Sequence, residues 1–499
     1  MSDAYGKLLE RIKDLGRLDA IEALLDWDQQ VNMPPGGVQG RAEQLSLIAG
    51  LAHEWKTSDE IGRLLSEAES HNGEFTAATN IREMARTFDR ARRVPTKLVK
   101  KIAHTTALSQ NAWATARAES DFSKFAPWLT QLLDLKRQEA EYIGYETEAY
   151  DALMDAFEPG AKSAEVESLF RTLRDATVPL VKAIAESPNQ PDSSILTRHY
   201  ARSAQKTLSR AVAELLNFDF NQGRTDVSVH PFCTTIVPAS DVRLTSRYEE
   251  NFLPAGMFGT MHEVGHGLYE QGLLKEHTFT PMGSAVSLGI HESQSRMWEN
   301  MVGRSRAFWE FYYSHVQKAF PDVLGSVALD DFYRAVNTVS PSLIRVEADE
   351  VTYNLHIVLR FELERELLSG RLEVKDVPTA WNEKMGDMIG IVPPDDARGC
   401  LQDIHWSIGT FGYFPTYAMG NLYAAQFFKQ AQADLPDLND CIRRGQLRPL
   451  LDWLRENIHR HGQRYRAGEL IERVTGRPLS IEPFVNYVTE KFEAIYGLS

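Results

Sequence analysis

The sequence TMHEVGHGLYEQG occupies residues 260–272 and places His262 and His266 four positions apart, with Glu263 directly after the first histidine. On a helix, residues at i and i+4 project from one face, about one turn apart. Both imidazoles can therefore reach the same ion, and Glu263 lies beside that ion, where it can act as a general base on an activated water. The stretch predicts a helix that carries a metal site.

The residues around this motif favour a buried helix. The flanking side chains are largely apolar, and the glycines of the segment would weaken a surface helix without a gain. Buried histidines beside a buried glutamate need partners, and a divalent cation supplies them. The alternative is a pair of histidines on a helix surface. The apolar flanks are Phe258, Met261, Val264, Leu268 and Tyr269.

A catalytic zinc usually has a third protein ligand and an open position for water. Tyr269 and Gly272 occupy the positions where a metzincin needs glycine and histidine, so that class is excluded. The segment GIHESQSRMWENMVG, residues 289–303, reads as a second amphipathic helix, and Glu292 near its start is the candidate ligand. A carboxylate that only favours the helix dipole is the structural alternative. Three other glutamates are rivals: Glu270, Glu276 and Glu299.

Most of the remaining chain has a helical pattern. Apolar residues recur at intervals of three and four in segments such as 98–116, and a loop at 187–192 interrupts the pattern. No internal repeat or low-complexity linker divides the 499 residues. We expect a mostly α fold in a single domain, 1–499, with a helical part over about residues 1–220 and a metal-binding part over about residues 221–499.

The segment 225–248 differs, because β-branched residues, prolines and a period of two predict two short strands. In DVRLTSRY the side chains alternate between two faces of a strand. The polar face either lines a groove or belongs to a solvated edge strand. The apolar face holds Val242, Leu244 and Tyr248, and the polar face holds Asp241, Arg243 and Thr245.

Another segment, 343–368, shows the periodicity of one amphipathic helix, with Arg345, Asp349, Thr352 and His356 on its polar face. Together with the other segments, it predicts a mostly α protein with a small β element.

Charge and cysteine content exclude several classes of protein. With 54 Lys and Arg against 69 Asp and Glu, the net charge of −15 argues against a nucleic-acid partner. The three cysteines form no Cys-x-x-Cys pair, which excludes a disulfide framework and a thiolate zinc site. The N-terminal residues lack the apolar core of a signal peptide, and no stretch is apolar enough to span a membrane. We expect a cytoplasmic protein with no membrane partner.

Several segments together resemble one family, the carboxypeptidase Taq family of metallocarboxypeptidases. The resemblance implies a mostly helical single domain with a deep central groove lined by the β element, and a homodimer. It also implies a zinc enzyme, which Co²⁺ can activate, that removes C-terminal residues of peptides one at a time. The matching segments are LLDWDQQVNMPPGGVQGRAEQL (24–45), HPF (230–232), DVRLT (241–245), HEVGH (262–266), HESQS (291–295), IRVEAD (344–349) and GCLQDIHW (399–406).

Under this resemblance, the metal ligands are His262, His266 and Glu292, and Glu263 is the general base. The developing oxyanion needs hydrogen-bond donors beyond the metal. His405 is one candidate, and the resemblance favours Tyr417 as another, with Tyr413 as its alternative. Both tyrosines can instead be core residues with a satisfied hydroxyl group.

A carboxypeptidase must also recognise the free C-terminal carboxylate, and arginine binds carboxylates through paired hydrogen bonds. Arg345 is the candidate anchor, with Glu347 and Asp349 expected to hold its side chain; a purely structural salt bridge to these acids is the alternative. His230 is expected on the substrate side, where a satisfied core histidine is the alternative. Arg243 is expected to line the groove or to close its end.

Two competing functions remain at this point. A metallo-oligoendopeptidase would share the helical fold and the ligands, and would differ in how its groove ends and in the use of a carboxylate anchor. A helical scaffold with a structural metal would instead need closed coordination by four ligands.

Overall fold

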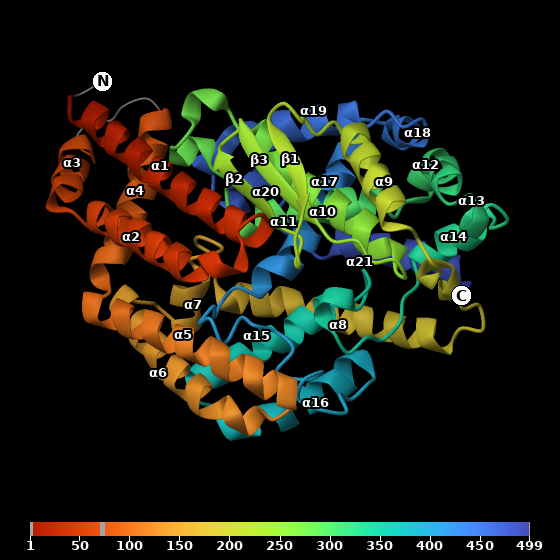
Figure 1. The fold of residues 1–499 in the computed structure, drawn as a ribbon, viewed down its shortest axis with the longest axis horizontal. Helices are drawn as coiled ribbons and strands as arrows, with labels where there is room; N and C mark the ends of the chain where they lie inside the picture. Colours follow the sequence, from red (N-terminus) through yellow and green to blue (C-terminus); the bar gives the residue numbers. More distant parts are fainter. Residues whose placement is uncertain (1–2, 70–74, 499) are drawn as a thin grey trace. The chain divides into compact units, whose positions relative to one another are not determined.

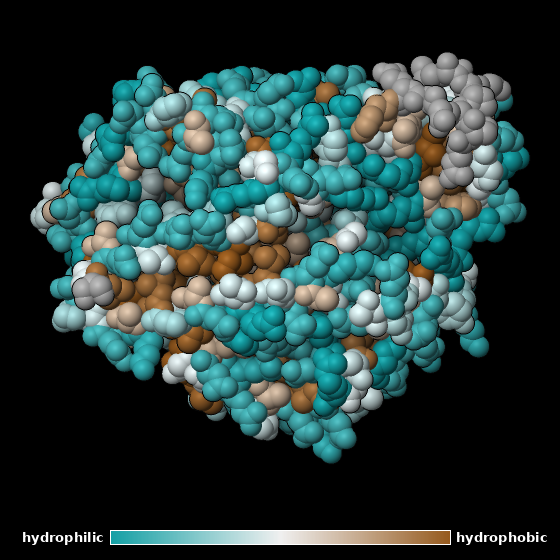
Figure 2. Space-filling view, turned by 180° about the vertical axis from the view of Figure 1, so that it is seen from behind, coloured by the Kyte–Doolittle hydropathy of each residue, from teal (hydrophilic) through white to brown (hydrophobic). Residues whose placement is uncertain are grey.

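A computed structural model describes residues 3–69 and 75–498 of the chain. Helices form most of these residues, and the strands found among them make one small sheet (Figure 1). The prediction of a mostly α protein with a small β element is confirmed. On the face drawn in Figure 2, hydrophilic side chains predominate over hydrophobic ones.

The chain divides into two compact units, each assembled from three separate stretches. The first unit comprises Met1–Arg92, Asp192–Val336 and Ala424–Pro478, and the second comprises Arg93–Pro191, Asn337–Tyr423 and Leu479–Ser499. A single domain over the whole chain stays a prediction.

The first unit contains the HEVGH motif, residues 262–266. Its N-terminal helices pack through a stripe of apolar residues, Tyr5, Leu8, Ile12 and Leu15, whose spacing of three and four places them on one face of α1. Helix α17, Pro415–Asp434, begins in the second unit and ends in the first. The other helices of the first unit are α1 (Asp3–Val31), α2 (Val38–Lys56), α3 (Asp59–Glu69), α4 (Phe75–Arg93), α9 (Arg202–Leu215), α10 (Leu253–Gly272), α11 (Leu288–Arg296), α12 (Arg306–Ala319), α13 (Pro321–Leu324), α14 (Leu329–Val336), α18 (Leu438–Arg443), α19 (Arg448–Asn457) and α20 (Ala467–Thr475).

The sheet of the first unit packs against α10 (Figure 1). It has three strands, β1 (Gly223–Val227), β2 (Cys233–Val237) and β3 (Asp241–Ser246), in the order β1-β3-β2. Strand β3 is parallel to β1 and antiparallel to β2, so it is central, and the edge-strand alternative is wrong. The prediction of two strands is also wrong, because the polar sequence GRTDV of β1 lacks an apolar alternation.

The alternation along β3 is mostly as predicted. Val242 and Leu244 are buried, and Asp241 and Arg243 are partly exposed. Thr245 departs from the prediction, because it is buried and its hydroxyl bonds to the Ser228 hydroxyl at 2.7 Å. It therefore holds the β1–β2 loop and is no part of an open polar face.

The second unit is also helical. Its helices are α5 (Thr96–Glu119), α6 (Ala126–Ile143), α7 (Ala149–Met154), α8 (Ser163–Glu186), α15 (Tyr353–Ser369), α16 (Val377–Ile389) and α21 (Glu482–Tyr496).

The predicted helix over 343–368 begins later than expected. Arg345–Glu347 form a 3-10 turn, and α15 starts only at Tyr353. The Asp349 carboxylate accepts hydrogen bonds from the amides of Val351 and Thr352, at 2.9 and 3.0 Å. These bonds favour a turn over a continuing helix, since an aspartate that binds the amides ahead of it competes with helical backbone bonds.

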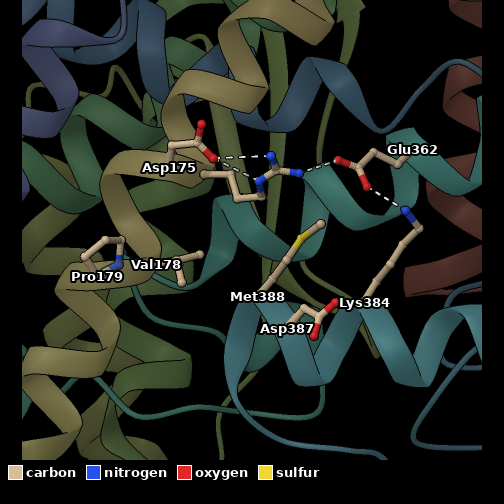
Figure 3. Close-up of a pocket in the computed structure, with 8 residues that line it drawn as sticks. Asp175, Val178, Pro179, Glu362, Lys384, Asp387 and Met388 are labelled. Atoms are coloured by element: carbon tan, nitrogen blue, oxygen red, sulfur yellow. Dashed lines mark hydrogen bonds and ion pairs between the residues drawn. The ribbon is translucent and has the colours of Figure 1, made fainter.

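A pocket of about 500 Å³ lies among α8, α15 and α16 of the second unit (Figure 3). In it, Glu362 accepts hydrogen bonds from both Arg174 and Lys384, at 3.2 and 2.6 Å. The positive charges of Arg174 and Lys384 are therefore balanced by a carboxylate of the same pocket.

The helices of the described residues include none that is both long enough and apolar enough to cross a membrane.

Candidate active site

Helix α10 presents both histidines of the HEVGH motif. Gly265 lies between them in sequence, at the contact between α10 and α11. A β-carbon on Gly265 would lie 2.6 Å from the Cα of Ser295, so only glycine allows the two helices to come this close. The glycine that would weaken a surface helix is thus explained by tight packing against the helix that carries Glu292.

Three side chains of the first unit converge. The Nε2 atoms of His262 and His266 lie 3.6 and 3.4 Å from Oε2 of Glu292. One ligand atom from each of the three residues lies within 4.8 Å of the others. Two imidazole nitrogens and one carboxylate oxygen, held by two helices, are the donor set of a catalytic zinc site with an open position. The residues therefore fit a divalent metal ion.

Ligands must offer lone pairs, and two of these three groups have the protonation state that a metal ion needs. The third is His262: burial lowers its pKa, but the Glu292 and Glu299 carboxylates outweigh burial and raise it. Burial lowers the pKa of His266 to about 3, so this imidazole is neutral near neutral pH. Burial raises the pKa of Glu292, but the positive charges of Arg296 and His262 outweigh it and hold the pKa well below its usual value. Glu292 is therefore ionised.

Of the three rival glutamates, two contact histidine side chains and one is exposed. Glu299, on the π-helical turn Met297–Val302, accepts a hydrogen bond from Nδ1 of His262 at 2.9 Å. Glu270 lies 2.9 Å from Nε2 of His291, and Glu276 is exposed. Glu299 thus supports a candidate ligand from its outer side, which the spacing in the sequence did not reveal.

Glu263 is buried on α10, next in sequence to His262. Burial raises the pKa of its carboxyl group to about 7, although the neighbouring His262 opposes the rise. A carboxyl group with a pKa near neutrality is suited to both accepting and releasing a proton.

Arg345 belongs to the second unit and is buried. Its Nε and Nη2 donate to Oδ1 of Asp403 at 3.1 and 2.8 Å, and its Nη1 donates to the Tyr353 hydroxyl at 3.0 Å. The prediction that Glu347 and Asp349 hold the Arg345 side chain is wrong. Glu347 is exposed and Asp349 binds backbone amides, because this segment is a turn and not a helix.

Asp403 also binds Arg360, whose Nε donates to Oδ2 at 2.7 Å. His356 is fully buried nearby, and burial and the charge of Arg360 hold its pKa well below its usual value, so it is neutral. The guanidinium groups of Arg345 and Arg360 thus share the Asp403 carboxylate. Together, these three groups carry one excess positive charge. Sequence reasoning missed Asp403 and Arg360, although both lie in segments already singled out.

The candidate oxyanion donors lie together in the second unit. Nε2 of His405 is 3.4 Å from the Tyr417 hydroxyl, and the rings of Tyr413 and Tyr417 have centroids 5.1 Å apart. Burial lowers the pKa of His405 to about 4, so the imidazole is neutral and can donate one proton. Tyr417 is the tyrosine whose hydroxyl meets His405, but Tyr413 is close enough to stay an alternative.

The loop that carries His405 is tied to α15 by Glu364. This carboxyl group accepts hydrogen bonds from Nε1 of Trp406 at 3.0 Å, the amide of Gly412 at 3.0 Å and the Tyr150 hydroxyl at 2.8 Å. It is fully buried, and burial raises its pKa to about 7 in spite of these bonds. Sequence reasoning missed this residue, since a glutamate inside an amphipathic helix gives no signal of its own.

Glu364 gives the stability of the protein a dependence on pH. The pKa of Glu364 is higher in the folded state than in the unfolded chain. Between about pH 4.5 and 7, the folded protein therefore keeps a proton that the unfolded chain has already lost. The Glu364 contribution to the unfolding free energy therefore falls as the pH rises. Glu364→Gln should destabilise the protein at pH 5, because a buried donor is left unmatched, and the gap to the wild type should shrink by pH 8.

Urea unfolding of both proteins at pH 5 and pH 8 measures this gap. Glu366→Gln, on the same helix, is the control for the loss of one carboxylate. A gap that stays constant or widens with pH would contradict the assigned role of Glu364.

Two further candidates lie at the sheet. Arg243 donates to the Asp241 carboxylate at 3.0 and 2.8 Å, and its guanidinium lies 4.3 Å from the ring centroid of Trp27 on α1. His230 is exposed in the loop between β1 and β2, so the alternative of a satisfied core histidine is wrong. Both residues belong to the first unit, with the candidate metal ligands.

Comparisons with known proteins cover nearly the whole chain. The profile of the family described as Carboxypeptidase Taq (M32) metallopeptidase matches residues 7–492. The chain is 45% identical to thermostable carboxypeptidase 1 of Thermus thermophilus, over 99% of each sequence. It is 37% identical to carboxypeptidase 1 of Bacillus subtilis, over 99% of this chain and 98% of the relative.

Solved structures agree with this assignment. The crystal structure of the M32 carboxypeptidase from Deinococcus radiodurans R1 is 40% identical, with a TM-score of 0.97 over 99% of this chain and 100% of that one. The carboxypeptidase of Pyrococcus furiosus is 37% identical, with a TM-score of 0.95 over 99% of both chains. The chain therefore belongs to the carboxypeptidase Taq (M32) family of metallopeptidases and is a metallocarboxypeptidase.

Proposed function

We propose that the enzyme removes single amino acids from the C-terminus of peptides, with zinc held by His262, His266 and Glu292. The observation that carries this proposal is the convergence of both Nε2 atoms on Oε2 of Glu292. Such a site supplies Lewis acidity, which acidifies a water molecule and polarises the scissile carbonyl group.

In the proposed reaction, Glu263 moves the proton. Its carboxylate accepts a proton from the attacking water and then delivers it to the nitrogen of the leaving amine. The pKa of about 7 that burial gives this group supports both steps. His405 and Tyr417 are proposed as donors to the oxyanion, since a neutral imidazole and a phenol both offer a proton without adding charge.

Arg345 is proposed to bind the C-terminal carboxylate of the substrate. The excess positive charge shared with Arg360 and Asp403 supports this role, because a buried cation stabilises an anion more strongly than an exposed one. Asp403 holds the guanidinium in place from one side, so the group is ordered before the substrate arrives. Arg243 is proposed to close the substrate groove, and His230 and Tyr413 are proposed to assist in binding the peptide.

Amidation of the substrate C-terminus separates this proposal from a metallo-oligoendopeptidase. An amidated peptide lacks the negative charge that Arg345 would bind, and charge-assisted hydrogen bonds are worth about 1.5–3 kcal/mol each. We expect kcat/KM to fall at least about 100-fold relative to the free acid, since two such bonds are lost together. Mass spectrometry of digests measures the loss, and the free acid should give a ladder that shortens from its C-terminus.

An N-acetylated peptide with a free carboxylate is the matched control and should be cleaved at the normal rate. Equal cleavage of the amidated and free peptides, or internal fragments from both, would instead support the oligoendopeptidase.

We also propose the resident metal and the compartment of the enzyme. Zinc suits two imidazoles and a carboxylate, and Co²⁺ accepts the same ligands. Cys233, Cys400 and Cys441 are unpaired, which fits a reducing cytoplasm. The homodimer stays a prediction from the family resemblance.

A further inference from the structure

The outer side of His266 begins a chain of hydrogen bonds that the proposed reaction does not use. Nδ1 of His266 lies 2.5 Å from Nδ1 of His291, and Nε2 of His291 lies 2.9 Å from Oε1 of Glu270. Glu270 stands one helical turn after His266 on α10, and His291 precedes Glu292 on α11. The chain therefore connects the same two helices as the candidate metal ligands.

The order of protons along this chain follows from the geometry. Nε2 of His266 faces Glu292, so a metal ion bound there would leave the ring proton on Nδ1. Nδ1 of His291 must then accept that proton's hydrogen bond, which leaves the proton of His291 on Nε2. There it donates to the Glu270 carboxylate. A single tautomer of each ring satisfies every contact.

We propose that His291 and Glu270 are positioning residues that hold His266 in the tautomer and orientation of a metal ligand. The inference rests on the proposed metal centre. The ring of His291 is itself fixed by packing, since its centroid lies 4.6 Å from that of His266 and 5.3 Å from that of Tyr269.

The two candidate histidine ligands are supported in different ways. His262 meets the Glu299 carboxylate directly, at 2.9 Å, and Arg296 donates to the same carboxylate oxygen at 3.2 Å. On its Nδ1 side, His266 is connected to the Glu270 carboxylate through the imidazole of His291. Hydrogen-bond partners of this kind typically change metal affinity by about 10–100-fold when they are removed.

The test measures metal binding without substrate, so it stays independent of the proposed reaction. His291→Leu removes both hydrogen bonds, and its dissociation constant for Zn²⁺, from competition with a chelator, should rise about 10–100-fold. His291→Asn keeps an acceptor oxygen near the position of Nδ1 and should recover most of the affinity. Glu270→Leu removes only the last link and should weaken binding less than His291→Leu. The visible absorption of bound Co²⁺ should shift in His291→Leu and Glu270→Leu.

A buried histidine of the same unit, His459, provides the control. His459 packs against the ring of Tyr269 at 4.9 Å and bonds to Oε1 of Gln294 at 2.9 Å. His459→Leu should lower the unfolding temperature and leave the Zn²⁺ affinity and the Co²⁺ spectrum unchanged.

Each outcome decides the proposal. Wild-type affinity in His291→Leu overturns it, and so does an equal loss in His459→Leu, which would show a general effect of packing. If His291→Leu does not fold, wild-type affinity and an unchanged Co²⁺ spectrum in Glu270→Leu overturn it instead. Absence of Zn²⁺ binding in the wild-type protein would remove the metal centre itself and thereby overturn the proposal with it.

Discussion

Glu263→Gln should keep the fold and the bound zinc but lose nearly all peptidase activity. Glutamine has the size of glutamate but cannot accept a proton at neutral pH, so both proposed proton transfers fail. General acid and base groups typically contribute about 100–10,000-fold to a rate, and we expect a loss of kcat at the upper end of that range. Steady-state kinetics with a free-acid peptide, together with the zinc content of the same sample, measures the effect.

Glu276→Gln is the matched control, because Glu276 is an exposed glutamate a short distance along the chain. This variant should behave as the wild type. If Glu263→Gln kept wild-type kcat with its zinc bound, another group would have to be the base. Retained metal and fold with lost hydrolysis would also exclude the scaffold with a purely structural metal.

Glu292→Gln should lose the metal ion itself. A neutral amide is a poorer ligand than a carboxylate, and Arg296, which donates to Glu292 at 2.7 Å, would lose its anionic partner. We expect the dissociation constant for Zn²⁺ to rise by more than about 100-fold. Loss of a residue that only hydrogen-bonds to a ligand typically raises it by about 10–100-fold. Activity at limiting zinc should fall in parallel, and excess zinc should restore part of it.

Chelator competition followed by metal analysis gives the affinity, and circular dichroism of the metal-free proteins tests the fold. A catalytic metal predicts that the helical signal survives chelation, since α10 and α11 also pack closely through Gly265 and Ser295. An unchanged zinc affinity in Glu292→Gln would identify a different third ligand.

The local part of the site followed from the sequence. His262 and His266 are one helical turn apart, so their shared face on α10 could be predicted from spacing alone. Glu292 could be placed on a second helix, because the residues around it have an amphipathic pattern. The resemblance to a family added the choice of ligand. The supporting contacts did not follow, because they join residues that are distant in the chain. Arg345 and Asp403 are 58 positions apart, so no helical periodicity relates them.

Periodicity also failed where a local contact opposed it. The segment 343–368 has a helical pattern throughout, but the Asp349 carboxylate binds two backbone amides and α15 begins only at Tyr353. Strand β1 was missed for a related reason. Its sequence is polar, and it is a strand because β3 lies beside it, which a reading of β1 alone does not include.

Gly265 is essential to the candidate metal site, although it is not one of the candidate ligands. The distance from the two histidines to Glu292 is set by how closely α10 approaches α11, and that approach requires hydrogen where other amino acids carry a β-carbon. A methyl group added there would meet the backbone of Gln294 and Ser295 and would push α10 and α11 apart, together with the candidate ligands that they carry. The arrangement of the three candidate ligands therefore depends on the absence of a side chain at a residue that lies between the two histidines.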